Sequence, residues 1–187
     1  MTERESRVWK ITAIRQSYLV IGAGPIGTAL ATWLADAGHE VRLATRSGSG
    51  PDLPGVQRIA LDAADQAAMT KAADGTDTLF NCANPGAYQT WEKLWPPLAN
   101  SVLHAATASG AVLVTLSNLY SYGPVDGPMT AETPERPSDH KGALRARLWQ
   151  GALAAYQTGK VRVTEARASD YIGANASGDR GRRSAFC

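Results

Sequence analysis

The chain has 187 residues, which is enough for one domain with a sizeable hydrophobic core and short for two. Hydrophobic residues make up 44% and charged residues 19%, which is ordinary for a globular protein, and the formal net charge is only +2. Basic residues are scattered until the last stretch, so we expect no nucleic-acid partner. No apolar run reaches the ~20 residues of a membrane span, and residues 1–10 lack the apolar core of a secretion signal. We therefore expect a cytoplasmic protein without a membrane partner.

The two cysteines, Cys82 and Cys187, are too few for a disulfide framework, and their spacing matches no metal site. We therefore predict no bound metal. Nothing near Cys82 in the sequence would lower the pKa of its thiol, so we interpret it as a small buried residue and not as a nucleophile.

Residues 18–46 have the pattern of one strand–turn–helix–strand unit. Residues 18–21 form a short apolar run, which is typical of a strand buried on both faces. A glycine-rich turn follows at once, and apolar residues then recur at helical spacing until Gly38, which is placed to end the helix. Residues 41–44 are the second predicted strand.

The turn carries glycines in G-x-G-x-x-G spacing. In that motif the first glycine permits the tight turn, the second lets a pyrophosphate approach the backbone, and the third lets the helix pack closely on the strand. The strand and helix on either side are the context that the motif requires, so we predict a dinucleotide site. The alternative is a glycine-rich turn in some other α/β protein. The predicted cofactor-binding residues of the turn are Gly22, Gly24, Pro25, Ile26 and Gly27.

The end of the second strand indicates which dinucleotide is bound. An acidic residue there would bind a ribose 2′-hydroxyl, but residues 41–51 contain no Asp or Glu. Arg46 could instead pair with a 2′-phosphate, with Thr45 or Ser47 adding a hydroxyl donor. We therefore expect NADP(H) to be favoured over NAD(H). Alternatively, Arg46 is a solvated loop charge and the preference stays open.

Beyond this unit, strands and helices continue to alternate along the chain. Asp62 ends the third predicted strand, where it could contact the adenine, cap the following helix, or do both. The alternation predicts an α/β fold with a doubly wound parallel sheet between two helical layers. The further strands are expected at 56–61, 76–83, 111–116 and 161–166, and the further helices at 63–73, 94–109 and 141–157.

In an open α/β sheet, ligands bind beyond the carboxyl ends of the strands. Ala83, Asn84 and Pro85 follow the fourth predicted strand, so we expect them to lie along the cofactor. Residues 117–139 form a polar loop rich in proline and glycine, and a loop of that length in a compact domain is usually functional.

At this point the sequence resembles the short-chain dehydrogenase/reductase superfamily, and within it the extended and atypical NAD-dependent epimerase/dehydratase group. The resemblance covers residues 18–173 and rests on GAGPIG, the Asp62 strand end, NCANP, SNLYSYGP with TAETP, and RASDYIG. It implies a Rossmann domain, a nicotinamide cofactor, and hydride transfer to or from a sugar-nucleotide or other small carbonyl or alcohol substrate. Homodimers are common in the superfamily and are therefore possible here.

The family's catalytic positions are altered in this chain. The resemblance implies a Ser or Thr after the fifth strand and a Tyr-x-x-x-Lys pair on the next helix. These positions fall on Asn118, preceded by Ser117, and on Lys141 and Arg145. Arginine is a poor proton donor at neutral pH, whereas Lys141 could act as an acid if burial and Arg145 depressed its pKa. Alternatively, Lys141 and Arg145 contact phosphate or ribose, or form a solvated basic face; Tyr120 or Tyr122 could then supply a phenol.

Two functions follow from these observations. One is an NADP(H)-linked oxidoreductase or epimerase-like enzyme, and the other is a non-catalytic dinucleotide-binding module or sensor. A flavoprotein is a distant third, because the acid after the second strand is missing. We expect residues 1–17 to be an N-terminal lead, residues 18–175 the dinucleotide-binding domain, and residues 176–187 an irregular basic tail that suggests truncation or a frameshift rather than a minimal domain.

Overall fold

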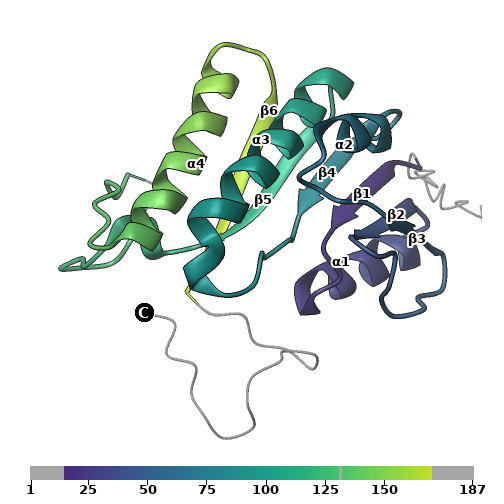
Figure 1. Cartoon of the computed structure of the whole chain (residues 1–187), viewed down its shortest axis with the longest axis horizontal. Helices are drawn as coiled ribbons and strands as arrows, with labels where there is room; N and C mark the ends of the chain where they lie inside the picture. The colour runs from purple at the N-terminus through teal and green to yellow at the C-terminus, as the bar shows by residue number, and fades with distance from the viewer. Residues whose placement is uncertain (1–14, 131, 170–187) are drawn as a thin grey trace, which may run out of the picture.

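The chain folds around one parallel sheet of six strands in the order β3-β2-β1-β4-β5-β6. The computed structural model describes residues 15–130 and 132–169 (Figure 1). The strands β1, β2 and β3 extend the sheet toward one edge, and β4, β5 and β6 extend it toward the other. The strand order therefore reverses between β1 and β4. The strands are β1 (Ser17–Ile21), β2 (Glu40–Thr45), β3 (Val56–Ala60), β4 (Thr78–Asn81), β5 (Val112–Asn118) and β6 (Arg162–Ala168).

Helices cover both faces of the sheet and make three layers, as predicted. The alternation of side chains along β1 shows the division. Leu19 and Ile21 lie in a core shared with α2 and α3, whereas Tyr18 and Val20 lie in a second core beneath α1. In Figure 1, α2, α3 and α4 lie side by side on one face. The helices are α1 (Pro25–Asp36), α2 (Gln66–Ala73), α3 (Trp91–Ser109) and α4 (His140–Gln157), with short 3-10 turns η1 (Tyr88–Thr90) and η2 (Tyr120–Tyr122).

The glycine turn between β1 and α1 has the backbone that the motif predicts. Gly22 has a φ of 101°, a backbone conformation that residues other than glycine rarely adopt. A Cβ at Gly27 would overlap the carbonyl oxygen of Gly22, so the first turn of α1 packs directly against the end of β1. A Cβ at Gly24 would meet nothing within 4 Å. The backbone at Gly24 is therefore open to a ligand, whereas the backbone at Gly27 packs closely on the end of β1.

Two predicted helix starts are wrong. Asp62 does not cap a helix: its carboxylate accepts a hydrogen bond from the Ala64 N–H at 3.0 Å and closes a turn. The cap of α2 is Asp65, which accepts from the Ala68 N–H at 3.0 Å. The predicted helix 94–109 begins earlier, at Trp91, so that Pro96 and Pro97 lie inside the helix.

The predicted N-terminal lead falls mostly, and the predicted tail 176–187 entirely, outside the described residues. Within the described ranges, no helix is long and apolar enough to cross a membrane. The described sheet spans Ser17–Ala168, while the outer limits of the domain stay a prediction.

We expect Gly27→Ala to destabilise the fold, because the added methyl group would push α1 away from β1. Overpacking of this kind typically costs about 1–3 kcal/mol in the free energy of unfolding. Gly151→Ala on α4 is the matched control, since a Cβ there meets nothing within 4 Å and alanine favours a helix. Urea unfolding of both variants would measure the difference, and equal stabilities would contradict the close packing.

Candidate functional site

A cleft of about 590 Å³ lies across the carboxyl ends of the strands. It runs from the loops after β2 and β3, past the glycine turn, to the loops after β4 and β5. Most residues predicted to bind a cofactor or substrate line it. The exceptions are Gly27, which packs beneath the turn, and Ser47, Tyr122 and Lys141. The lining includes Gly22, Gly24, Pro25, Ile26, Thr45, Arg46, Asp62, Ala83, Asn84, Pro85, Ser117, Asn118, Tyr120 and Arg145.

The part of the cleft near β2 and β3 presents one basic and one acidic side chain. Arg46, which follows β2, and Asp62, which follows β3, are both exposed and line the cleft on the same side of the glycine turn. The Thr45 hydroxyl donates to the Ser49 carbonyl at 2.7 Å, and the Ser47 and Ser49 hydroxyls lie 2.7 Å apart. The hydroxyl groups therefore shape the loop that carries Arg46.

Cys82 lies beneath the middle of the cleft, between the glycine turn and the loop after β4. Burial raises the pKa of its thiol to about 12, so the thiol stays protonated at neutral pH. A Cβ at Gly27 would come within 3.3 Å of the Cys82 Cβ, which shows how closely this residue packs under the turn. These observations agree with the predicted packing role.

Arg145 is buried at the far end of the cleft and connects α4 to the end of β5. Only 5% of the residue is exposed. Its guanidinium donates to the Leu116 carbonyl at 3.0 Å and to the Ser117 hydroxyl at 2.7 Å, and it lies 4.4 Å from the centre of the Trp95 ring. The predicted site residues Ser117 and Arg145 are thus in direct contact, and Arg145 brings a fixed positive charge to the cleft.

Lys141 is not among the described residues that line the cleft. Its ammonium lies 3.6 Å from the Asp139 carboxylate and 4.7 Å and 5.4 Å from the ring centres of Tyr88 and Tyr120. The Gly142 N–H, and less strongly the charge of Lys141, hold the pKa of Asp139 below its usual range. Lys141 thus contacts the rings of Tyr88 and Tyr120, which line the cleft, but does not line the cleft itself.

Three aromatic residues that no sequence motif predicted also line this end of the cleft: Tyr88, Trp91 and Trp95. They belong to η1 and α3, and only a contact across the fold brings them to Tyr120 and Arg145. Asn118, at the family's Ser/Thr position, accepts a hydrogen bond from the Tyr120 N–H at 3.2 Å.

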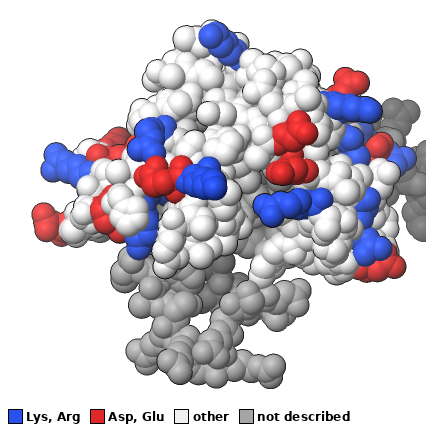
Figure 2. Space-filling view, viewed as in Figure 1, with Lys and Arg blue, Asp and Glu red and all other residues white. Residues whose placement is uncertain are grey.

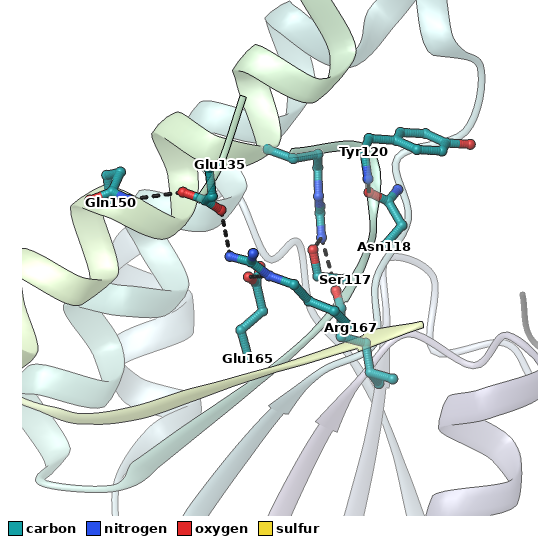
Figure 3. A network of polar contacts seen from close by, with 9 residues as sticks. Ser117, Asn118, Tyr120, Glu135, Gln150, Glu165 and Arg167 are labelled. Atoms are coloured by element: carbon teal, nitrogen blue, oxygen red, sulfur yellow. Dashed lines mark hydrogen bonds and ion pairs between the residues drawn. The ribbon is translucent and has the colours of Figure 1, made fainter. Parts of the chain in front are cut away.

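A polar network holds the loop between β5 and α4 against β6 (Figure 3). Arg167, paired with Ser117 in the strand register, lies 2.7 Å from Glu135 and 2.6 Å from Glu165. Burial alone would lower the pKa of Arg167, but these two carboxylates raise it, so the guanidinium remains charged. Gln150 on α4 donates to Glu135 at 2.8 Å. The network therefore fixes the loop next to the Ser117 end of the cleft; residues 170–173 of the predicted RASDYIG segment lie outside the described residues.

Charges of both signs are interspersed over the helical face in Figure 2. In the part of the chain that the structure describes, no three His, Cys, Asp or Glu residues come together as metal ligands. The polar side chains that line the cleft include the carboxylate of Asp62, the hydroxyl groups of Ser117 and Tyr120, and the guanidinium groups of Arg46 and Arg145.

The family model described as "NAD dependent epimerase/dehydratase family" matches residues 18–186. The chain belongs to this family. Its parallel sheet of six strands with helices on both faces is the Rossmann-like fold that the resemblance implied. No curated protein matches the chain significantly.

Several solved structures resemble the chain. MoeE5 in complex with UDP-glucuronic acid and NAD is 25% identical with a TM-score of 0.67, over 81% of this chain and 53% of that one. A point mutant of uronate dehydrogenase from Agrobacterium tumefaciens, complexed with NAD, is 22% identical with a TM-score of 0.69, over 80% and 59%. UDP-N-acetylglucosamine 4-epimerase from Methanobrevibacter ruminantium, in complex with UDP-N-acetylmuramic acid, is 16% identical with a TM-score of 0.78, over 91% and 59%. The chain thus spans a little over half the length of these proteins.

We expect Cys82 to react slowly with thiol reagents. With a thiol pKa of about 12, only about one molecule in ten thousand carries a thiolate at pH 8. In a Cys187→Ser variant, where Cys82 is the single cysteine, iodoacetamide labelling at pH 8 should be at least about a hundredfold slower in the folded chain than in urea. Similar rates would contradict the burial of Cys82.

We also expect Arg145→Met to lower the free energy of unfolding by roughly 1.5–3 kcal/mol, because Ser117 and the Leu116 carbonyl lose a charged donor. Arg147→Met on the same helix is the control. Its ion pair with Glu92 is more than half exposed, so its loss should cost less than about 1 kcal/mol. Thermal unfolding would compare the two variants, and a larger loss for Arg147→Met would contradict the anchoring role of Arg145.

Proposed function

We propose that the chain is an NADP(H)-favouring oxidoreductase of the epimerase/dehydratase type that acts on a sugar nucleotide or another small carbonyl or alcohol substrate. The observation that carries this proposal is one continuous cleft that extends from the glycine turn to Ser117, Asn118 and Tyr120. A nicotinamide cofactor bound in this cleft would supply the hydride donor or acceptor. The cytoplasmic location and the possible homodimer belong to this proposal as predictions.

The residues divide the cleft into binding regions. Gly22, Gly24 and the start of α1 would hold the pyrophosphate, since backbone N–H groups at a helix N-terminus favour a negative charge. Asp62 would lie beside the adenosine, and residues 83–85 would run along the cofactor toward β5. The nicotinamide and the substrate would then meet near Ser117, Asn118 and Tyr120, with the positive charge of Arg145 behind Ser117.

The choice of NADP(H) rests on Arg46. It is exposed, lines the outer end of the cleft, and stands where an acidic residue would bind a 2′-hydroxyl. MoeE5 and the uronate dehydrogenase are complexed with NAD, so the preference for NADP(H) is a property proposed for this chain's own residues. The sugar-nucleotide class is supported by the UDP-glucuronic acid and UDP-N-acetylmuramic acid named in two of them.

A non-catalytic NADP(H)-binding module is the second candidate. It is favoured by the replacement of the family's Tyr and Lys by Lys141 and Arg145, because Lys141 does not reach the cleft directly and Arg145 is held against Ser117. Absorbance at the reduced nicotinamide band, with UDP-glucose and UDP-glucuronic acid as probes and NADP⁺ or NAD⁺ as oxidant, tests catalysis. Cofactor binding with no turnover of these or other sugar nucleotides would favour the module.

We expect Arg46→Ala to weaken NADPH binding about tenfold to a hundredfold, since a charge-assisted hydrogen bond to phosphate is worth roughly 1.5–3 kcal/mol. NADH binding should change less than about twofold. Calorimetric titration of the wild type, Arg46→Ala and the control Arg147→Ala would measure both affinities. Equal losses for NADPH and NADH in Arg46→Ala would contradict the 2′-phosphate role. No binding of either cofactor by the folded wild type would reject the proposed function.

A further inference from the structure

Tyr88 places a phenol at the end of the cleft where the reaction would occur. It is the first residue of η1, in the loop that follows β4, and its side chain lines the cleft while 38% of the residue remains exposed. Its ring packs edge-on against Trp91 with 4.9 Å between ring centres. The Trp91 indole in turn donates to the Gly86 carbonyl at 3.1 Å, which closes the loop that carries Tyr88. The phenol is therefore accessible and also held in place.

The hydroxyl of Tyr88 lies 3.1 Å from the hydroxyl of Tyr120. The two tyrosines come from the loops after β4 and β5, which are neighbours in the sheet. The adenosine end of the cleft is on the opposite side of the glycine turn, near β2 and β3, so the phenol pair lies toward the nicotinamide end. Either hydroxyl can donate to the other, which allows a proton to pass between them.

The cation that belongs to this pair is Lys141. Its ammonium lies 4.7 Å from the ring centre of Tyr88 and 5.4 Å from that of Tyr120, within the range of a cation–π interaction. The side chain is 23% exposed, and its partner Asp139 also caps α4 through the Gly142 N–H at 2.8 Å. Lys141 is thus held by the first turn of α4, and its ammonium lies over the rings of both tyrosines.

We propose that Tyr88 is the proton-transferring residue of this site, with Tyr120 as its hydrogen-bond partner and Lys141 as the positioning residue that holds both rings. The proposal rests on the proposed oxidoreductase function. It gives the chain a phenol from η1 and an ammonium from α4, the two groups of the family's altered Tyr-x-x-x-Lys pair, with the partner phenol of Tyr120 on η2. Lys141 stands at the former tyrosine position but acts through the rings rather than as the acid.

The chemistry balances in either direction. In reduction, the Tyr88 hydroxyl gives its proton to the carbonyl oxygen of the substrate while the carbonyl carbon receives a hydride from the reduced nicotinamide. The products are an alcohol, the oxidised nicotinamide and a Tyr88 phenolate, which regains a proton from water or through Tyr120. In oxidation, the phenolate accepts the hydroxyl proton of the alcohol while the hydride leaves its carbon for the oxidised nicotinamide. The exposure of Tyr88 supplies the contact with water that this exchange requires.

Tyrosine labelled with ¹³C at Cζ gives one NMR signal per tyrosine, and this signal reports the hydrogen bond and charge of each phenol. Tyr88→Phe should shift the Tyr120 signal, Tyr120→Phe should shift the Tyr88 signal, and Lys141→Met should shift both. Addition of NADP⁺ to the wild type should shift both signals. Tyr156→Phe is the matched control, because Tyr156 is 53% exposed near the end of α4 and does not line the cleft.

In turnover of a sugar nucleotide, with UDP-glucose as the first probe, Tyr88→Phe should lower kcat by about 10²–10⁴. Its NADP⁺ affinity should stay within about twofold of the wild type, and Tyr156→Phe should keep wild-type kcat. Lys141→Met should lower kcat less than Tyr88→Phe does.

Wild-type kcat in Tyr88→Phe would overturn the proposal, as would loss of activity in Tyr120→Phe alone. NADP⁺ binding that leaves both tyrosine signals unmoved would overturn it without touching the proposed cofactor binding. Failure of the folded wild type to bind NADP⁺ or NAD⁺ would instead reject the proposed function on which this inference rests.

Discussion

The close approach of α1 to the end of β1 is the constraint on which the rest of the structure depends. Gly27 leaves no room for a Cβ beside the Gly22 carbonyl, and Gly22 itself needs a positive φ. This contact sets the N-terminus of α1 at the point where the strand order reverses. A cleft must then open between the loops on either side, because the loops of β1 and β4 diverge from that point.

Positive charge is distributed unevenly along this cleft. Arg46 is exposed at the outer end, whereas Arg145 is almost wholly buried at the inner end against Trp95 and Ser117. Screening by water and salt weakens an exposed charge more than a buried one. Arg46 is therefore suited to recognising an anion that arrives from solvent, and Arg145 to maintaining a constant field and geometry at the Ser117 end.

The inner end of the cleft is built by contacts among segments that are distant in sequence. Trp91 and Trp95 of α3 support Tyr120 and Arg145, while Arg167 of β6 ties down the loop through Glu135. The buried charges in this region are paired or stacked, which offsets the cost of removing them from water. Aromatic rings and the guanidinium of Arg145 therefore line the inner end of the cleft in contact with one another.

The sequence by itself determined the strand–helix alternation, the glycine turn and the residues along the outer half of the cleft. These features depend on local periodicity and on backbone geometry at Gly22, Gly24 and Gly27, and neighbouring residues encode both. Local sequence signals predicted the starts of two helices incorrectly. Asp65 and not Asp62 caps α2, and α3 begins at Trp91 before its prolines.

Only the tertiary structure decided what surrounds the inner half of the cleft. Tyr88 and Tyr120 are 32 residues apart, and nothing in the periodicity of either segment indicates that their hydroxyls lie within hydrogen-bonding distance. The place of Lys141 likewise depends on how the first turn of α4 packs against η2, where a Cβ at Gly142 would overlap the Tyr120 carbonyl oxygen. Contacts of this kind arise from the packing of whole elements, so their physical cause lies in the shared core and not in any short stretch of sequence.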